Sequence, residues 1–471
     1  MGPHGLAELA GGVLAGAQAW LFPGATLLYL LYPLVVLSWT VVEGVAATEG
    51  HESLGGSIRS CCFRRREGRG VKKGTEEQQN GCDAYACGKT ASTPGCAWPE
   101  SFGPQQSHIG LLLQGLAQAR TFWRAVRYWV VFFVLALRLM LYALLLSPWF
   151  LRIGYKYFHD PRIRRGVRYG NNPRNYLDIY FPEEAMDATK DAGLKLPVVV
   201  TVMGGAWVIG HRLWNVLLGM RLAQANVLVV AVDYRNFPCA LMHDMVEDVG
   251  CALDWVFANI ASCHGDPENI MLVGQSAGAH LEAMVLLERC LAEAGGQASA
   301  PCWSPRDLRA FLGVSGPFDL VAIEPHLESR GIYSFLPHLC ADGDLARCSP
   351  TRVLQAPAWQ AAAAKATARL PPVCLFGGAA DRSVPPACST GFAEALRAAG
   401  AQNVVVELGK GVRHAQPVVE DPLTGGDLQV QLILPYLFKE EAQPRVEDLP
   451  PPPYPQVPKV LASLALRLMP F

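Results

Sequence analysis

The apolar residues of this chain form long runs in its first third and shorter, strand-length runs after residue 169. No charged residue occurs from Gly11 to Thr40, and the apolar run from Ala25 to Val42 is long enough to span a bilayer of about 30 Å. A signal peptide is the competing interpretation, but no basic stretch precedes the run and the run is too long. We therefore expect an N-terminal transmembrane segment within residues 1–43.

The next two segments have opposite characters. Residues 44–120 lose hydrophobic periodicity and are rich in Gly, Ser, Cys and basic residues, which predicts a disordered linker. Residues 121–150 contain the apolar run Tyr128–Phe150, interrupted by Arg138, whose insertion into lipid costs about 2.5–3.5 kcal/mol. This segment is predicted to be a second transmembrane helix or an interfacial helix, and pairing of Arg138 with a partner is a further alternative.

Strand-length apolar runs alternate with helical periodicity over residues 151–445. The predicted strands are 177–181, 197–202, 227–232, 269–274, 309–314, 373–376 and 404–408, and the predicted helices are 242–259, 277–292, 360–369, 390–399 and 428–438. This alternation predicts the α/β class: one domain with a mostly parallel central sheet and helices on both faces. Four consecutive prolines begin at Pro450, so residues 446–471 are interpreted as a Pro-rich C-terminal tail that includes a short amphipathic helix.

Composition and charge limit the classes of function that the chain could have. Hydrophobic residues make up 51% and charged residues 17% of the 471 residues, which fits a chain that lies partly in lipid. The net charge of −1 gives no indication of a nucleic-acid partner. The 14 cysteines include no C-x-x-C pair and no zinc-type spacing, so we expect neither a metal nor a cofactor and favour a reducing compartment.

The stretch Met271–His280 carries the clearest chemical signal. An apolar strand runs into Gly274-Gln275-Ser276-Ala277-Gly278 and then directly into a helix, which is the context of a nucleophile elbow. In such a turn the serine hydroxyl stands at the top of the sheet beside the free N–H groups of the helix N-terminus. Ser276 is therefore the candidate nucleophile.

A serine hydroxyl needs a base to take its proton and an acid to orient that base. Asp381 follows the strand over 373–376, and His414 follows the strand over 404–408. Both fall at the carboxyl edge of a parallel sheet, in the order serine, acid, histidine expected for this architecture. Taken alone, Asp381 could simply cap a turn and His414 could be an ordinary residue of a surface loop. Because both follow the nucleophile elbow in the expected order, together they predict a triad with Ser276.

The tetrahedral intermediate of acyl transfer also needs hydrogen-bond donors for its oxyanion. Gly204 and Gly205 directly follow the strand over 197–202, where esterases place an oxyanion loop. Their backbone N–H groups, with that of Ala277, are the predicted donors. A plain glycine pair between a strand and a loop is the alternative.

Four motifs taken together resemble the isoprenylcysteine methylesterases, membrane-associated members of the α/β-hydrolase superfamily that are similar to hormone-sensitive-lipase-type carboxylesterases. The motifs are Gly204–Gly210 (GGAWVIG), Asp233–Pro238 (DYRNFP), Gly265–Ile270 (GDPENI) and Gly274–His280 (GQSAGAH). The resemblance covers about residues 169–437. One departure from the wider esterase pattern is Met203, where a histidine commonly begins the oxyanion loop.

The resemblance implies a substrate and a location. It implies a serine carboxylesterase that hydrolyses the C-terminal methyl ester of farnesyl- or geranylgeranyl-cysteine, releasing methanol, at endoplasmic reticulum or Golgi membranes. The cysteine usage, which favours a reducing compartment, leads us to expect a catalytic domain that faces the cytosol. Ser276, Asp381 and His414 match its triad, Gly204, Gly205 and Ala277 its oxyanion hole, and Ala206, Trp207 and Gln275 its substrate-binding loops. The loop from Cys302 to Pro350 is expected to contribute to the acyl pocket.

Other functions remain open from the residues alone. A general carboxylesterase, a lipase or an arylformamidase would use the same fold and triad. A non-catalytic prenyl-binding protein of hydrolase-like fold is a further alternative, although it would not need all three triad residues.

Overall fold

The computed structural model describes residues 108–186, 193–296, 303–330 and 336–469. The predicted segment 1–43 and residues 44–107 of the predicted linker lie outside these described residues. Everything described from Arg127 onward belongs to one compact unit, while residues 42–126 fall in another. The description below concerns the first of these units. The start of its longest helix, before Arg127, belongs to the other unit.

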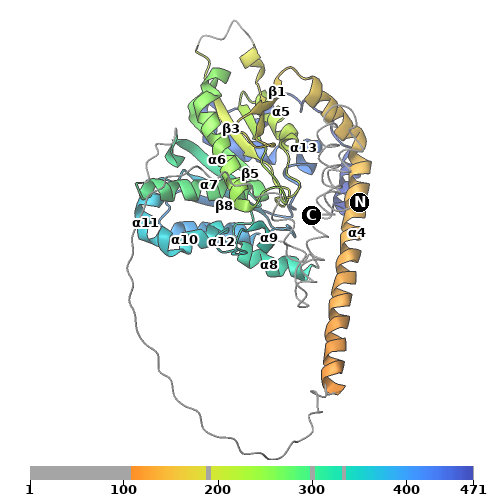
Figure 1. Cartoon of the computed structure of the whole chain (residues 1–471). Helices are drawn as coiled ribbons and strands as arrows, with labels where there is room; N and C mark the ends of the chain where they lie inside the picture. The colour runs from red at the N-terminus through yellow and green to blue at the C-terminus, as the bar shows by residue number, and fades with distance from the viewer. Residues whose placement is uncertain (1–107, 187–192, 297–302, 331–335, 470–471) are drawn as a thin grey trace, which may run out of the picture. The chain divides into compact units, whose positions relative to one another are not determined.

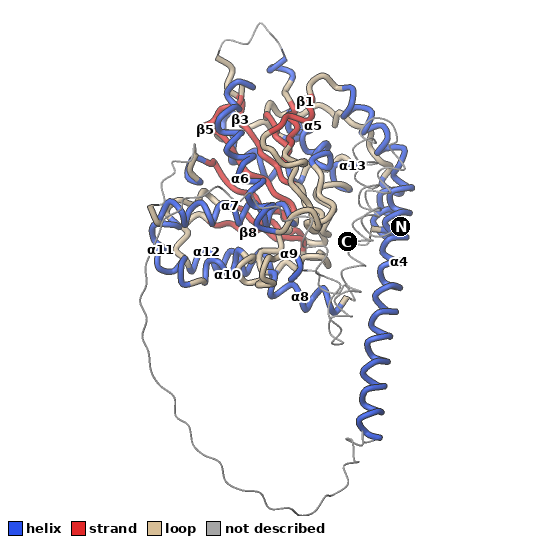
Figure 2. The backbone as a smooth tube through the Cα atoms, viewed as in Figure 1, coloured by secondary structure: helices blue, strands red, loops and turns tan. Residues whose placement is uncertain are grey.

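An eight-stranded sheet forms the centre of this unit, in the order β1-β2-β4-β3-β5-β6-β7-β8 (Figures 1 and 2). Its strands are β1 (Ile163–Arg168), β2 (Tyr176–Tyr180), β3 (Leu196–Val202), β4 (Leu228–Val232), β5 (Gly265–Gln275), β6 (Leu308–Val314), β7 (Val373–Gly378) and β8 (Val404–Gly409). From β4 to β8 all neighbours pair in parallel, whereas β2 pairs antiparallel with both β1 and β4. The predicted mostly parallel α/β sheet is confirmed.

Helices cover both faces of the sheet, as Figure 2 shows. The α-helices are α4 (His108–His159), α5 (Val216–Gln224), α6 (Met242–Asn259), α7 (Ala277–Ala294), α8 (Leu320–Ser329), α9 (Leu336–Leu339), α10 (Pro350–Gln355), α11 (Pro357–Thr367), α12 (Ala387–Ala398), α13 (Glu420–Leu423), α14 (Leu428–Leu437) and α15 (Lys459–Leu468). Short 3₁₀ turns lie at Glu183–Met186, Arg212–Asn215, Ile260–Cys263, Pro305–Asp307, Glu440–Ala442 and Val446–Asp448.

The inner strands β3 and β4 are buried at every position because each face of the sheet meets its own helical layer. In β3, Val198 and Val200 belong to the core shared with α6 and α7, whereas Val199 belongs to the core shared with α5 and α14. This two-sided burial holds the central strands in register, and it places their carboxyl ends at one edge of the sheet.

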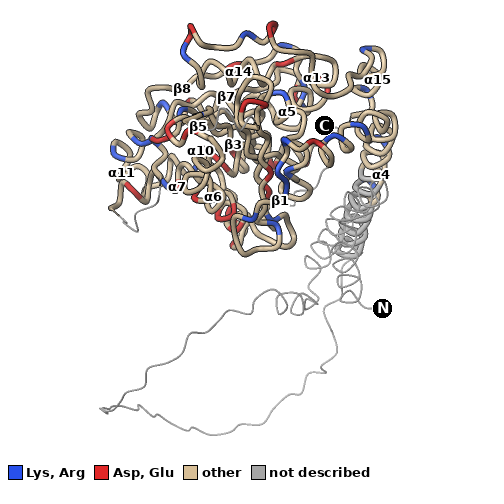
Figure 3. The backbone as a smooth tube through the Cα atoms, turned by 90° about the horizontal axis from the view of Figure 1, so that it is seen from above, with Lys and Arg blue, Asp and Glu red and all other residues tan. Residues whose placement is uncertain are grey.

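Three parts of the sequence-based description differ from the structure. α4 begins at His108, before the expected linker boundary at residue 120, because the apolar run Ile109–Leu116 continues the helix. β1 was not predicted, since three of its six residues are arginines, as suits an exposed edge strand; these lie among the blue segments around β1 in Figure 3. The expected loop 302–350 is partly helical, because it includes α8 and α9.

Among the described residues, one helical stretch, Phe133–His159, is long and apolar enough to cross a membrane, which is weak evidence taken alone. This part of α4 has two different faces. Tyr142, Leu146 and Ile153 are buried against the domain. Leu144 and Leu151, on the other side of the helix, are exposed.

Arg138, the charge within this apolar run, is paired with the end of another helix. Its guanidinium donates to the carbonyl oxygens of Arg467, Leu468 and Met469 at 2.8–3.2 Å. The last carbonyls of a helix lack intrahelical donors and carry partial negative charge, so a cation there is stabilising. The structure thus supplies the partner that the sequence left open.

Candidate active site

The turn between β5 and α7 places Ser276 in a constrained backbone conformation, with φ of 53° and ψ of −122°. The serine N–H donates to the Val314 carbonyl at 2.8 Å, which fixes the turn against the end of β6. A Cβ at Gly274 would lie 2.4 Å from the Ala279 Cα, and one at Gly278 would lie 2.0 Å from the Val202 oxygen. Both positions therefore require glycine for the strand, the turn and the helix to approach this closely.

The structure brings the three predicted triad residues into one hydrogen-bonded series. His414 Nε2 lies 3.0 Å from Ser276 Oγ, and His414 Nδ1 lies 2.8 Å from Asp381 Oδ2. The other carboxylate oxygen of Asp381 accepts from the backbone N–H groups of Ser383 and Val384 at 2.8 and 2.9 Å. Because a carboxylate only accepts, Nδ1 carries the proton and Nε2 is free to accept from the serine hydroxyl.

The predicted oxyanion loop lies directly beside Ser276. A Cβ at Gly204 would fall 2.6 Å from the Ser276 Cβ, so this backbone is in contact with the reacting residue. Gly205, Ala206 and Trp207 have positive φ values of 131°, 50° and 61°. Ala277 is the first residue of α7, where backbone N–H groups lack helical acceptors. The N–H groups proposed from the sequence therefore come from two backbone segments that meet at Ser276.

The side chain of Trp207 is buried and anchors the loop. Its indole N–H donates to His280 Nδ1 at 3.3 Å, and His280 Nε2 lies 2.7 Å from the Cys348 carbonyl. The carbonyl only accepts, so His280 holds its proton on Nε2 and is neutral. Burial lowers the pKa of His280 to about 4, which keeps this pairing intact at neutral pH. The backbone of the 302–350 segment thus supports the oxyanion loop through His280.

The Asp233–Pro238 motif holds the same loop from its other side. Asp233 forms ion pairs with Arg174 and Arg212, and Arg174 also donates to the Gly210 carbonyl at 2.6 Å. Burial by itself would raise the pKa of Asp233, but the charges of Arg174 and its neighbours outweigh it and hold that pKa below its usual value. Tyr234 donates to the Met203 carbonyl at 3.2 Å. The motif therefore fixes both ends of the oxyanion loop.

Gln275 is almost fully buried, and its side-chain amide is directed to the histidine loop. Its Nε2 donates to the His414 carbonyl at 3.4 Å. The residue before the nucleophile therefore contacts the backbone of the residue that accepts the serine proton. This geometry gives Gln275 a contact within the protein in addition to its proposed contact with substrate.

Beneath the elbow, Glu282 of α7 is completely buried. Its carboxyl group packs on Gly274, since a Cβ there would lie 2.5 Å from Glu282 Oε2. Neither carboxyl oxygen has a hydrogen-bond partner among the described residues. Burial raises the pKa of Glu282 well above its ordinary value, so the folded protein disfavours the charged form.

Glu282→Met is expected to raise the free energy of unfolding at pH 7 by on the order of 1–3 kcal/mol, the usual cost of an unsatisfied buried polar group. The folded pKa lies above the unfolded value of about 4.3, so the penalty in the wild type is absent at lower pH and increases as pH rises. The gain should therefore be larger at pH 7 than at pH 5 in urea titrations. Glu394→Met, at an exposed position of α12, controls for the loss of one carboxylate; an equal gain at both pH values would contradict this account.

Comparisons with known proteins match the same part of the chain. The BD-FAE family model matches residues 177–396. The isoprenylcysteine alpha-carbonyl methylesterase ICME of Arabidopsis thaliana is 39% identical over 339 residues, which cover 71% of this chain and 76% of that protein. The chain belongs to the isoprenylcysteine alpha-carbonyl methylesterase family. The probable isoprenylcysteine alpha-carbonyl methylesterase ICMEL1 of Oryza sativa subsp. japonica is 40% identical over 71% of this chain and 77% of its own length.

Membership of the methylesterase family confirms the resemblance expected from the motifs and makes the chain a carboxylic ester hydrolase. Among solved structures, native esterase 2 of Thermogutta terrifontis is 21% identical, with a TM-score of 0.41 over 60% of this chain and 96% of that one.

In this member of the methylesterase family, sequence reasoning missed the residues that support the site. His280 closes one quoted motif and was given no role, although a histidine four residues after a candidate nucleophile lies on the same helix. Glu282 gave no signal, since its burial depends on tertiary packing. The Cys348 carbonyl carries no side-chain information at all.

Proposed function

We propose that this chain hydrolyses the C-terminal methyl ester of an S-isoprenylated cysteine with Ser276 as the nucleophile. The observation that carries the proposal is the hydrogen-bonded series from Ser276 through His414 to Asp381, with distances of 3.0 and 2.8 Å. The curated relatives named as isoprenylcysteine methylesterases support the choice of substrate.

In the first half-reaction, Ser276 Oγ attacks the ester carbonyl carbon while its proton passes to His414 Nε2. The tetrahedral intermediate then collapses, and the methoxy oxygen leaves with the proton from Nε2 as methanol. In the second half-reaction, water attacks the acyl-enzyme and gives a proton to Nε2, which returns it to Oγ as the carboxylic acid departs. The acid then loses its proton to solvent and is released as the carboxylate. Asp381 keeps Nδ1 protonated and stabilises the imidazolium that forms twice.

The negative oxygen of each tetrahedral intermediate is placed between the N–H groups of Gly204, Gly205 and Ala277. Loss of one such donor typically lowers kcat by about 10² to 10³. These donors belong to a loop and a helix that the Trp207–His280 pair and the Asp233 ion pairs already hold in place. Little rearrangement is then needed as the charge develops.

Apolar residues lie beside the loop that carries His414. Met203, Ala415 and Val418 form a small buried apolar cluster between the oxyanion loop and the histidine loop. Met469, at the end of α15, packs on this cluster. We assign this region to the prenyl group, and the apolar stretch of α4 to contact with an endoplasmic reticulum or Golgi membrane on its cytosolic side.

Methanol release from N-acetyl-S-farnesylcysteine methyl ester tests the proposed substrate. The wild-type chain in detergent is expected to show a kcat/KM at least 100-fold higher for this ester than for the S-propyl analogue, because only the farnesyl ester buries a long apolar chain. Equal kcat/KM for both esters would overturn the prenyl assignment and favour a general carboxylesterase. Faster hydrolysis of an arylformamide than of either ester would favour an arylformamidase.

A further inference from the structure

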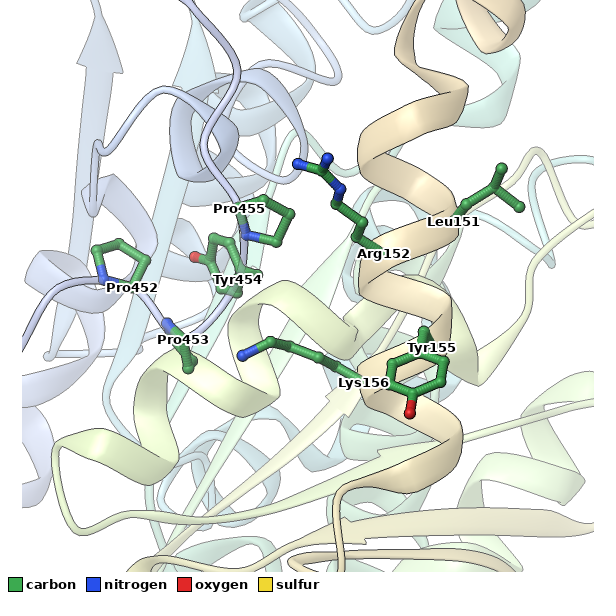
Figure 4. Close-up of a pocket in the computed structure, with 8 residues that line it drawn as sticks. All are labelled: Leu151, Arg152, Tyr155, Lys156, Pro452, Pro453, Tyr454 and Pro455. Carbon is green, nitrogen blue, oxygen red and sulfur yellow. The ribbon is translucent and has the colours of Figure 1, made fainter.

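A groove of about 580 Å³ lies between α4 and the proline-rich tail, and none of the residues that line it belongs to the triad (Figure 4). One wall is the α4 stretch that includes Leu151, Arg152, Tyr155 and Lys156. The other wall is the tail segment 452–455. The groove has no part in the mechanism described above, so its composition needs another explanation.

The tail wall is held at both ends. Arg221 donates to the Pro450 carbonyl at 2.5 Å and Gln224 donates to the Pro451 carbonyl at 3.0 Å. At the far end, Trp149 of α4 donates to the Gln456 carbonyl at 2.8 Å. Proline fixes φ, so this segment has little conformational freedom left to lose when a ligand binds. The groove is therefore preformed.

Two cations occupy the α4 wall. Arg152 and Lys156 lie one helical turn apart, and Figure 4 shows both side chains extending from α4 toward the tail. The groove is lined by no acidic residue, and neither cation forms an ion pair with another described residue. Asp160 is paired with Arg162 at 2.7 Å, which lowers the pKa of that carboxyl, and the charge of Lys156 contributes to the same shift. Two positive charges with shared direction and no ion-pair partner among the described residues favour an anionic ligand of phosphate size.

The α4 wall of the groove is continuous with an apolar surface of the same helix. Val130, Leu137, Leu144 and Leu151 are exposed and recur every seven residues, which places them along one side of α4. We call this the α4 stripe. Leu151 belongs both to the stripe and to the groove. A ligand that joins an anionic group to long apolar chains therefore matches the two surfaces together.

We propose that this groove binds the phosphate headgroup of an anionic membrane phospholipid whose acyl chains lie on the α4 stripe. In this arrangement α4 rests along the membrane surface: its buried face holds the catalytic domain and its exposed face enters the lipid. Arg152 and Lys156 then stand at headgroup level, where long basic side chains extend from an apolar helix. The inference does not depend on which ester the triad hydrolyses.

Native mass spectrometry of the full chain in nonionic detergent tests the site. Phosphatidylglycerol is expected to bind with a Kd at least tenfold lower than that of phosphatidylcholine with the same acyl chains. Arg152→Gln/Lys156→Gln should remove this preference, and the tenfold loss corresponds to about 1.4 kcal/mol. Arg152→Lys/Lys156→Arg, which keeps both charges, should retain the preference.

A matched control removes two other exposed lysines that do not line the groove, in Lys195→Gln/Lys410→Gln. This variant should keep the preference for phosphatidylglycerol, and circular dichroism should show that every variant is folded. Equal affinity for the two lipids, or an unchanged preference in Arg152→Gln/Lys156→Gln, would overturn the proposal. Inorganic phosphate that displaces the lipid at micromolar concentration would overturn it too, since the site would then take free phosphate.

Discussion

Replacing Ser276 by alanine is expected to lower kcat for ester hydrolysis by a factor of about 10⁶, because the nucleophile of a triad enzyme accounts for most of its rate enhancement. Ser276 is 8% exposed and its Oγ makes a 3.0 Å hydrogen bond to His414. Alanine keeps the Cβ and adds nothing to the elbow, so the fold should persist. Release of p-nitrophenol from a short p-nitrophenyl ester measures the change.

Ser315 provides a closely matched control for this variant. It is also a buried serine with positive φ, it follows the neighbouring strand β6, and its Oγ has no described hydrogen-bond partner. Ser315→Ala should leave kcat within about threefold of wild type, because it removes a buried hydroxyl that has no hydrogen-bond partner among the described residues. A Ser276→Ala enzyme with more than a hundredth of wild-type kcat would show that another group attacks the ester.

Most of the sheet could be predicted from the sequence because burial on both faces leaves a direct mark on composition. β4 is an uninterrupted apolar run, β3 is apolar except for Thr201, and α6 begins and ends where its periodicity does. β1 could not be predicted in this way, since an edge strand needs few apolar residues. The start of α4 was also missed, because Gly110, Gln114 and Gly115 interrupt the apolar residues of its first turns.

The part of the candidate site that could be predicted is the part whose position follows from the order of strands in the sheet. Ser276, Asp381 and His414 each follow a parallel strand, and parallel strands bring their carboxyl ends to one edge. The supporting contacts could not be predicted, because many of them use backbone atoms. His280 meets the Cys348 carbonyl, and Arg138 meets three carbonyls at the C-terminal end of α15. Any residue can present a carbonyl, so such partners leave no sequence signal.

Asp381→Asn should lower kcat by about 10⁴ while leaving the fold intact. The backbone N–H groups of Ser383 and Val384 donate to Oδ1, so the side-chain oxygen of asparagine must stay there and its NH₂ must face His414. That NH₂ donates to Nδ1, which moves the histidine proton to Nε2 and leaves no acceptor for the Ser276 hydroxyl. The measurement is kcat for the short p-nitrophenyl ester between pH 6 and 9.

Asp342→Asn is the control for Asp381→Asn, because Asp342 also pairs with a basic side chain, that of Arg347 at 2.8 Å, but at an exposed position. It should leave kcat unchanged across the same pH range. The two variants should unfold at the wild-type temperature within a few degrees, since asparagine preserves the turn at Asp381 and the pair at Asp342 is solvent-screened. If Asp381→Asn keeps kcat within tenfold of wild type, the carboxylate does not set the tautomer of His414, and the proposed relay fails at its third residue.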